Sequence, residues 1–544
     1  MFAPNSTIRL MKGVPLDSTY RNTIWFDNAG EQFEHFTNEY EYKLFSDQTY
    51  QRYARGTLRI SALADELYDY NYLAFRNNVN GAKGKIFYCF INSVEYIAER
   101  TTEIKYEIDY MQTYFFDYDL GDSFVEREHS ATDEIGENLI PENLELGEYI
   151  CSPTNNSDNL ITELLPLNIC VAATVKNVDG DVEDTDGQIY NGLYSGVALN
   201  VFSMDGDGIE AYKEFMSKLT KEAKSEGVTS VFCIPKVLST ERGTDISAPI
   251  VYKHTISVPD DYGILRTNGN NVKNKKLYTF PYTFLYVTNL QGTGVAYPFE
   301  YFEWKPGTLT DKSVEFNFSG DFSPMCNVLF YPIDYKGIHN NYDEKIELSG
   351  YPQLAFNIDT YKAYVAQNAG KIAASTVNNV ASVASNFNMG HLYSSANSID
   401  GGGLINSLGN VLNSIGSMRD KMVMPNQAKG GVNTSLAMLA RRIFTFQYLH
   451  KHIRPEFVDI IDDYFSMYGY ATHLVKKPNR NVRKNWTFVK TKGCIIISKE
   501  CPSMAIKAIC NIYDNGITFW NKSAVIGDYT QDNDVLDFVI PPLE

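Results

Sequence analysis

The sequence predicts a mainly β fold, made of β-barrel or sandwich domains and interrupted by one hydrophobic insert that is α-helical or irregular. The chain contains 38 Tyr and 31 Phe, and aromatic residues favour strands over helices. Short apolar runs recur between turn-forming segments, which is typical of barrels and sandwiches rather than of a parallel α/β sheet. Between Asp359 and Glu456 the only acidic residues are Asp400 and Asp420, which sets this segment apart from the rest.

The chain is long enough for several domains with packed cores, since it has 544 residues of which 44% are hydrophobic. Residues 1–150 are expected to form an N-terminal β-barrel domain, and residues 151–355 a second β-rich domain. Residues 356–450 form the insert. Residues 451–544 are expected to be a C-terminal β segment that completes the body of the protein.

Strands are expected where apolar or aromatic runs are bounded by turn residues. These runs are residues 57–60, 85–91 and 104–116 in the first domain, 167–175, 228–234, 277–287 and 314–318 in the second, and 486–490, 494–498, 505–512 and 516–520 after the insert. Residues 62–68 are expected to form a helical turn. A helix is expected at about residues 208–226, because apolar side chains such as Ile209, Tyr212 and Phe215 recur there at helical spacing.

The insert carries two helical patterns separated by a glycine hinge, Gly401, Gly402 and Gly403. Apolar residues recur at helical spacing on both sides of the hinge, and the positions between them are mostly uncharged. The apolar faces consist of Ala373, Val377, Val380 and Ala384 before the hinge and Leu404, Leu408, Val411, Leu412, Ile415 and Met418 after it. Asn and Ser cost less to remove from water than charged residues, so these faces could be membrane-active. The alternative is a helical hairpin that fills space within an assembly.

Charge and composition narrow the class of protein. The formal net charge is −18, so tight binding of nucleic acid through phosphate contacts is not expected. The chain has no uninterrupted apolar stretch of about 18 residues, as an ordinary transmembrane helix requires. Residues 1–12 lack the apolar run of a signal peptide. We therefore expect synthesis and assembly in a cytoplasm.

The sequence contains no motif for catalysis or for a cofactor. The 8 cysteines form no CxxC pair, which favours reduced core cysteines over a metal site. HExxH, GxSxG and a phosphate-binding glycine-rich lysine loop are absent. The sequence thus predicts no metal, no cofactor and no enzymatic activity.

Two polar clusters are candidates for contacts. In an extended conformation of residues 124–129 (FVEREH), Glu126 and Glu128 share one face, and Arg127 and His129 share the other. A salt-bridged domain or subunit contact is therefore favoured over a mixed catalytic cluster. The second cluster is basic and could touch DNA, but pairing with an acidic surface of a neighbouring subunit is favoured. It consists of Lys476, Lys477, Arg480, Arg483 and Lys484.

Several runs, in this order along the chain, resemble one family of phage proteins. They are residues 67–77 (LYDYNYLAFRN), 94–96 (VEY) with 106–109 (YEID), 124–129 (FVEREH), 141–147 (PENLELG), 464–470 (YFSMYGY), 476–484 (KKPNRNVRK) and 515–520 (NGITFW). The chain resembles the tail knob, or distal tail tube, proteins of small podoviruses with protein-primed genomes. The runs lie in the first and last parts of the chain, and the insert lies just ahead of YFSMYGY.

This resemblance implies a virion protein at the tail tip, with tail-tube-like barrel domains arranged as a homohexamer. It implies that long hydrophobic loops plug the tube and later leave it to help form a channel in the host membrane. The implied partners are further copies of the chain, the upper tail or lower collar protein, the host cell membrane, and phage DNA that passes through the lumen without sequence-specific binding. The insert has the expected place and length, although it is richer in Asn, Ser and Gly than a strongly hydrophobic plug.

Two other functions remain open from the residues alone. A receptor-binding tail adhesin would need exposed recognition loops, which residues 150–350 could supply. A cell-wall hydrolase would need a convergent polar site, and the sequence shows none.

Overall fold

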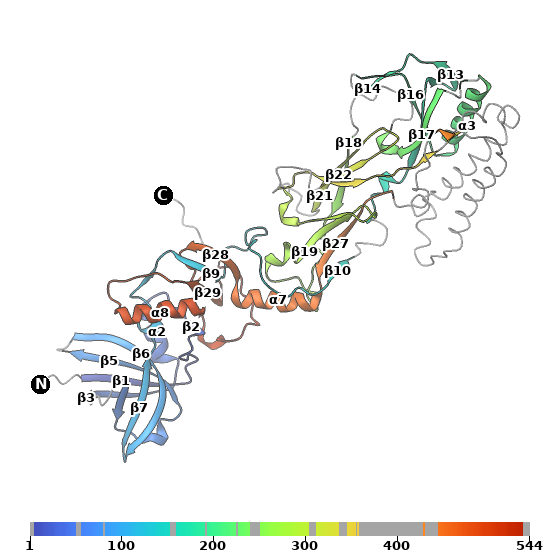
Figure 1. The fold of residues 1–544 in the computed structure, drawn as a ribbon. Helices are drawn as coiled ribbons and strands as arrows, with labels where there is room; N and C mark the ends of the chain where they lie inside the picture. Colours follow the sequence, from blue (N-terminus) through green and yellow to red (C-terminus); the bar gives the residue numbers. More distant parts are fainter. Residues whose placement is uncertain are drawn as a thin grey trace. The chain divides into compact units, whose positions relative to one another are not determined.

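The protein folds into two compact units, each described here by itself (Figure 1). The computed structural model describes residues 5–49, 56–79, 82–152, 159–190, 193–222, 224, 227–239, 251–303, 312–336, 345–354, 356–357, 428–429 and 444–536. Strands dominate these residues, which confirms the prediction of a mainly β protein. Unit 1 comprises Met1–Gly147, Leu265–Leu277 and Pro455–Glu544, and unit 2 comprises Glu148–Ile264 and Tyr278–Arg454.

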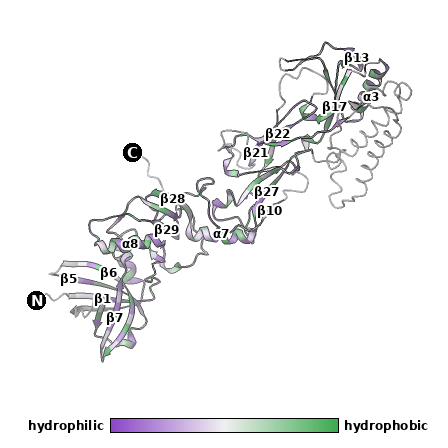
Figure 2. Cartoon of the chain, in the orientation of Figure 1, coloured by the Kyte–Doolittle hydropathy of each residue, from purple (hydrophilic) through white to green (hydrophobic). Residues whose placement is uncertain are grey.

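Unit 1 contains a six-stranded antiparallel sheet. Its order is β3 (Tyr42–Thr49), β1 (Asn5–Lys12), β5 (Tyr70–Val79), β6 (Ala82–Ala98), β7 (Thr101–Ile108) and β4 (Thr57–Ile60). Hydrophobic and hydrophilic residues are interspersed along its strands (Figure 2), and residues from both of its faces belong to buried clusters. The sheet curls, because Ile8 and Leu10 of β1 share one buried cluster with Leu58 and Ile60 of β4.

A second sheet of unit 1 is built from both ends of the chain. Its order is β2 (Asn22–Ile24), β31 (Ile517–Trp520), β29 (Trp486–Lys492), β9 (Ser123–Glu128) and β28 (Tyr470–Lys476). β2 and β31 are parallel, and the other neighbours are antiparallel. Strands from the first and last parts of the sequence therefore depend on each other for their backbone hydrogen bonds.

The second core of unit 1 combines residues of both sheets with residues of three helices. The helices are α1 (Ala29–Asn38), α2 (Tyr110–Thr113) and α8 (Ser503–Asn515). Phe36, Met111 and Ile509 of the helices belong to one buried cluster with Tyr72 of β5 and Phe519 of β31. This shared cluster joins the two sheets into one unit.

Several elements differ from those expected from the sequence. The strand predicted at residues 505–512 is wrong, because this segment lies in α8 and buries Ala505, Ile509 and Ile512 at helical spacing. The strand predicted at residues 104–116 ends at Ile108, since the side chain of Asp109 accepts a hydrogen bond from the backbone of Gln112 and caps α2. Two helices, α1 and α7 (Pro455–Tyr468), were not expected from the sequence. Helix α7 begins with a proline, a residue favoured at the first helical position.

Unit 2 contains three four-stranded sheets. They are β10 (Tyr149–Ser152), β27 (Gln447–Ile453), β19 (Thr283–Thr288) and β20 (Gly294–Tyr297); β18 (Val251–Ser257), β21 (Ser313–Gly320), β22 (Val328–Pro332) and β23 (Ile346–Leu348); and β16 (Ala198–Ser203), β11 (Leu167–Ala173), β17 (Val228–Pro235) and β24 (Gln353–Leu354). Helix α3 (Gly206–Lys221) confirms the predicted helix and packs its Tyr212 and Phe215 on Phe202 of β16. The strand expected at residues 277–287 begins only at Thr283.

The other strands and helices among the described residues are short. Paired strands are β12 (Val175–Val178) with β13 (Asp181–Asp184), β14 (Gln188–Tyr190) with β15 (Leu193–Ser195), and β8 (Asp119–Leu120) with β30 (Ile496–Ile497). The 3-10 helices are η1 (Ala64–Glu66), which lies in the helical turn expected at residues 62–68, and η2 (Thr162–Leu164), η4 (Lys236–Leu238), η5 (Lys275–Tyr278), η6 (Phe299–Tyr301) and η8 (Ser523–Val525).

The two flanks of the insert meet in unit 2. β25 (Phe356–Asn357) pairs antiparallel with β26 (Ala428–Lys429). The ring of Tyr351 stacks on that of Phe444, with 5.0 Å between the ring centroids. The predicted membrane-active residues lie outside the described residues: Ala373, Val377, Val380, Ala384, Leu404, Leu408, Val411, Leu412, Ile415 and Met418, together with the hinge residues Gly401, Gly402 and Gly403. Within the described ranges, no helix is long and apolar enough to cross a membrane.

Candidate functional site

The FVEREH run lies on β9, an inner strand of the five-stranded sheet, and continues into His129. Glu126 forms an ion pair with Lys490 of β29, with 3.0 Å between Glu126 Oε1 and Lys490 Nζ. The two side chains are 39% and 35% exposed. Solvent screens such a pair, so it contributes little to stability.

Arg127 belongs to a buried ionic network around Glu142. Lys276 Nζ lies 2.7 Å from Glu142 Oε1, and Arg127 forms a second ion pair with the same carboxylate. The backbone N–H of Ala471 donates to Glu142 Oε1 at 2.8 Å, and Arg127 Nη1 donates to the carbonyl of Gly469 at 2.6 Å. Burial lowers the pKa of Lys276, while the nearby Glu142 opposes that shift. The network ties together three segments of unit 1 that are far apart in sequence.

Glu128 joins the two clusters that the sequence analysis treats separately. Its buried carboxylate accepts hydrogen bonds from Asn479, at 2.8 Å from the backbone nitrogen and 3.0 Å from Nδ2. It also forms an ion pair with Lys476 of the basic cluster. Burial raises the pKa of Glu128, and the backbone hydrogen bond from Asn479 and the contact with Lys476 oppose the rise.

His129 is a buried, neutral and structural residue. Its Nδ1 accepts the backbone N–H of Phe488 at 2.8 Å, so its Nε2 carries the hydrogen and donates to the carbonyl of Ser466 at 3.1 Å. Burial and the positive charge of Arg483 lower the pKa of His129 to about 3. Both ring nitrogens are therefore occupied, which leaves neither free for proton transfer or metal binding.

The basic cluster does not form one exposed positive surface. Lys476 pairs with Glu128, and Lys484 Nζ lies 2.7 Å from Asp534 Oδ2. The guanidinium of Arg480 lies over the rings of Trp25 and Tyr118, at 5.3 and 5.8 Å from their centroids. Arg483 is buried, and Lys477 is exposed. A contact of these residues with DNA or with a neighbouring subunit stays a prediction.

Asp462 of α7 is a further buried carboxylate, which the sequence alone does not indicate. Its Oδ1 accepts the backbone N–H of Asn274 at 3.0 Å and Asn274 Nδ2 at 2.8 Å, and it pairs with Arg266. Arg266 also binds Asp463 and Asp459, at 2.9 and 3.2 Å. An acidic run in a helix (Asp459, Asp462 and Asp463) was the available signal, but its partners lie almost 200 residues earlier in the chain, and periodicity cannot reveal them.

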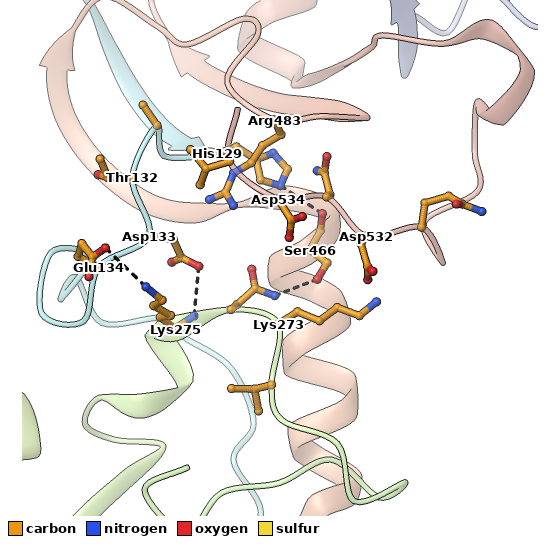
Figure 3. Close-up of a pocket in the computed structure, with 16 residues that line it drawn as sticks. His129, Thr132, Asp133, Glu134, Lys273, Lys275, Ser466, Arg483, Asp532 and Asp534 are labelled. Carbon is orange, nitrogen blue, oxygen red and sulfur yellow. Dashed lines mark hydrogen bonds and ion pairs between the residues drawn. The ribbon is translucent and has the colours of Figure 1, made fainter. Parts of the chain in front are cut away.

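A polar cavity of about 640 Å³ lies where these segments converge (Figure 3). It is lined by His129, Ala131, Thr132, Asp133, Glu134, Val272, Lys273, Asn274, Lys275, Ser466, Arg483, Gln531, Asp532, Asn533, Asp534 and Val535. The side chains of His129 and Arg483 lie close together on one wall of it (Figure 3). Among the described residues, no group of His, Cys, Asp and Glu could hold a metal ion.

Two family models match the chain. Residues 4–119, which include the six-stranded sheet, match the N-terminus of the caudoviral major tail protein. Residues 249–534 match the C-terminal domain of the tail knob protein gp9 of Bacillus phage phi29. A mainly β fold together with these two matches defines a structural protein of a phage tail. The second match covers more than half of the chain, which therefore belongs to the family of tail knob proteins related to gp9 of phage phi29.

Individual relatives agree with this assignment along nearly the whole chain. The chain is 24% identical to the tail knob protein gp9 of Bacillus phage B103 and 24% identical to that of phage phi29, over 97% of this chain and 98% of each relative. Its fold is similar to that of the tail knob protein gp12 of bacteriophage C1, with a TM-score of 0.60 and 14% identity over 98% of this chain and 100% of the other. The predicted family and a location in the virion tail are confirmed, and these relatives are structural proteins.

Proposed function

We propose that the chain forms a homohexameric conduit at the tail tip, through which phage DNA leaves the virion. In this proposal, residues 1–150 and 451–544 form the body of the tube. Residues 151–355 form a second β-rich domain, and residues 356–450 form a plug. The plug closes the tube before ejection and afterwards helps to penetrate the host cytoplasmic membrane. The tube contacts the upper tail or lower collar protein, and DNA passes without sequence-specific binding.

The observation that carries the proposal for the insert is the closed base from which it leaves unit 2. Pairing of β25 with β26 and stacking of Tyr351 on Phe444 hold the two flanks of the insert together. A long segment anchored at one base can change its surroundings while the sheets of unit 2 keep their hydrogen bonds. The acid-poor composition of the insert supports a transfer into lipid, because few carboxylates would have to leave water.

Dye release from liposomes tests the membrane role. Wild-type protein and a chain lacking residues 365–435 are compared at equal protein concentration. The deletion removes β26 but leaves every strand of the three four-stranded sheets of unit 2 in place, so these sheets serve as the internal control and are checked by circular dichroism. We expect release by the wild type only. Equal release by both chains would reject the membrane role and favour the space-filling interpretation of the insert.

Native mass spectrometry and negative-stain microscopy test the conduit. We expect six-membered rings with a central hole at high protein concentration. A folded chain that stays monomeric on its own and also on incubation with the collar protein would contradict the hexamer.

A further inference from the structure

Arg483 is a buried cation that forms no ion pair with any residue that the structure describes. The residue is 5% exposed, and its Nε has no hydrogen-bond partner. Its guanidinium points into the cavity described above (Figure 3). A guanidinium stays charged at all ordinary pH values, and an unpaired buried charge is costly. The geometry points to an oxyanion-binding site in this cavity, with Arg483 as its central ligand.

Of the four acidic side chains on the cavity wall, three bind other described groups and one faces water. Asp133 accepts hydrogen bonds from the hydroxyl of Tyr470 at 2.7 Å and from the backbone N–H of Lys275 at 3.3 Å. Asp534 pairs with Lys484 at 2.7 Å, and Glu134 pairs with Lys275 at 3.5 Å. Asp532 is exposed to water. Among the described residues, none of these acids forms an ion pair with Arg483.

His129 beside Arg483 cannot supply the missing negative charge. Its ring is neutral, and both of its nitrogens are used by backbone groups. The positive charge of Arg483 instead contributes to the low pKa of the His129 imidazole. Arg483 therefore keeps a buried N–H donor without a partner at the cavity.

Lys273 adds a second positive charge to the lining of the same cavity. It lines the cavity, it is exposed, and its ammonium forms no ion pair with a described residue. The planar guanidinium fork of Arg483 is suited to two oxygens of a phosphate or a carboxylate, and the charge of Lys273 favours an anion in the cavity. A phosphate and a carboxylate can each offer two oxygens to the guanidinium. The oxyanion could be free in solution or could be a carboxylate of a second copy of this acidic chain.

Thermal unfolding of the full chain with inorganic phosphate as the probe tests the site. Sodium phosphate is titrated against sodium chloride at constant ionic strength. We expect phosphate to raise the unfolding temperature of the wild type. Arg483→Met should weaken phosphate binding roughly tenfold or more, and Arg483→Lys should keep part of it. Without phosphate, Arg483→Met should unfold at the same or a higher temperature, because it removes an unpaired buried charge.

Lys477→Met is the matched control, since it removes an exposed positive charge from the same loop but lies outside the cavity. It should respond to phosphate as the wild type does. If Arg483→Met does not fold, Lys273→Met decides, because Lys273 is exposed and tolerates substitution; we expect it to weaken phosphate binding several-fold. An equal response of all variants to phosphate, or no response of the wild type, would overturn the proposal.

The two sources of the oxyanion give different results in native mass spectrometry. If a second copy supplies a carboxylate, phosphate and Arg483→Met should both lower the fraction of oligomer. If the oxyanion is free, both should leave that fraction unchanged while phosphate still stabilises the wild type. Either result supports the site.

Discussion

Lys276 Nζ and Glu142 Oε1 lie 2.7 Å apart although the two side chains are only 3% and 2% exposed. Such a buried pair is stable because each charge has further partners. Arg127 and the backbone of Ala471 complete the coordination of Glu142. Removing the carboxylate would leave two buried cations without compensation, whereas the exposed ion pair between Glu126 and Lys490 is screened by water.

Glu142→Gln should therefore lower the free energy of unfolding by about 3–5 kcal/mol. Urea unfolding is followed by tryptophan fluorescence, because Trp486 and Trp520 are buried in unit 1. Glu126→Gln is the control and should change the free energy of unfolding by about 0–1 kcal/mol. Equal effects of both substitutions would contradict the structural role of the buried network.

The pH dependence of stability should contain a contribution from His129. Its pKa is lowered to about 3 in the folded protein, against about 6.5 in an unfolded chain. The unfolded state therefore binds the proton first, so the stabilising effect is complete above about pH 6.5 and is lost as the pH falls toward 3. Between pH 6 and pH 5, each such histidine should lower the free energy of unfolding by up to about 1.4 kcal/mol per pH unit.

His129→Gln tests this contribution, since glutamine does not titrate. The variant should be less stable at pH 7 and should show a smaller decrease in stability between pH 6 and pH 5. His450, whose pKa is lowered by burial to about 4, should preserve part of the decrease in both proteins. The same slope in wild type and variant would show that His129 is not held neutral in the folded state.

Gly469 should not tolerate a side chain. Its φ is +64°, and a Cβ there would lie 2.1 Å from the carbonyl oxygen of Glu128. Gly469→Ala should lower the free energy of unfolding by about 2–3 kcal/mol or more, through backbone strain together with the clash. Gly493 is the control, because its φ is +73° and nothing lies within 4 Å of a Cβ. Its alanine variant should lose only about 1–2 kcal/mol.

Charges on the apolar face of the insert should abolish membrane activity. The double variant Leu408→Asp with Val411→Asp should release little dye from liposomes, because a charge costs about 2.5–3.5 kcal/mol at the centre of a membrane helix. Asn406→Asp with Asn413→Asp adds the same charge at polar positions and is the matched control. If both double variants permeabilise liposomes as the wild type does, the assigned apolar face is wrong.

The assembled protein should not bind duplex DNA tightly. Six copies would carry six times the formal charge of −18, and much of the basic cluster is already paired or buried within unit 1. Gel-shift experiments at physiological salt should show weak, non-specific binding. Tight binding that weakens steeply with salt would contradict a conduit through which DNA slides.

The sequence by itself determined the class of fold and the family. Aromatic content and short apolar runs indicated strands, because alternate residues of a strand pack on a core. The spacing of Ile209, Tyr212 and Phe215 located α3. The order of the family runs led to the tail knob family, which the comparisons then confirmed.

Only the tertiary structure decided the state of the polar residues. The run from Ala505 to Ile512 forms a helix, because a short apolar run fits a helix and a strand equally well until a core selects one face. Glu142 and Lys276 are 134 residues apart, so no local pattern could pair them. The basic run divides between Glu128, Asp534, two aromatic rings and a cavity, because the fold sends neighbouring side chains into different surroundings. The contribution of a charged side chain to stability or binding depends on its burial and its partners, and long-range packing sets both.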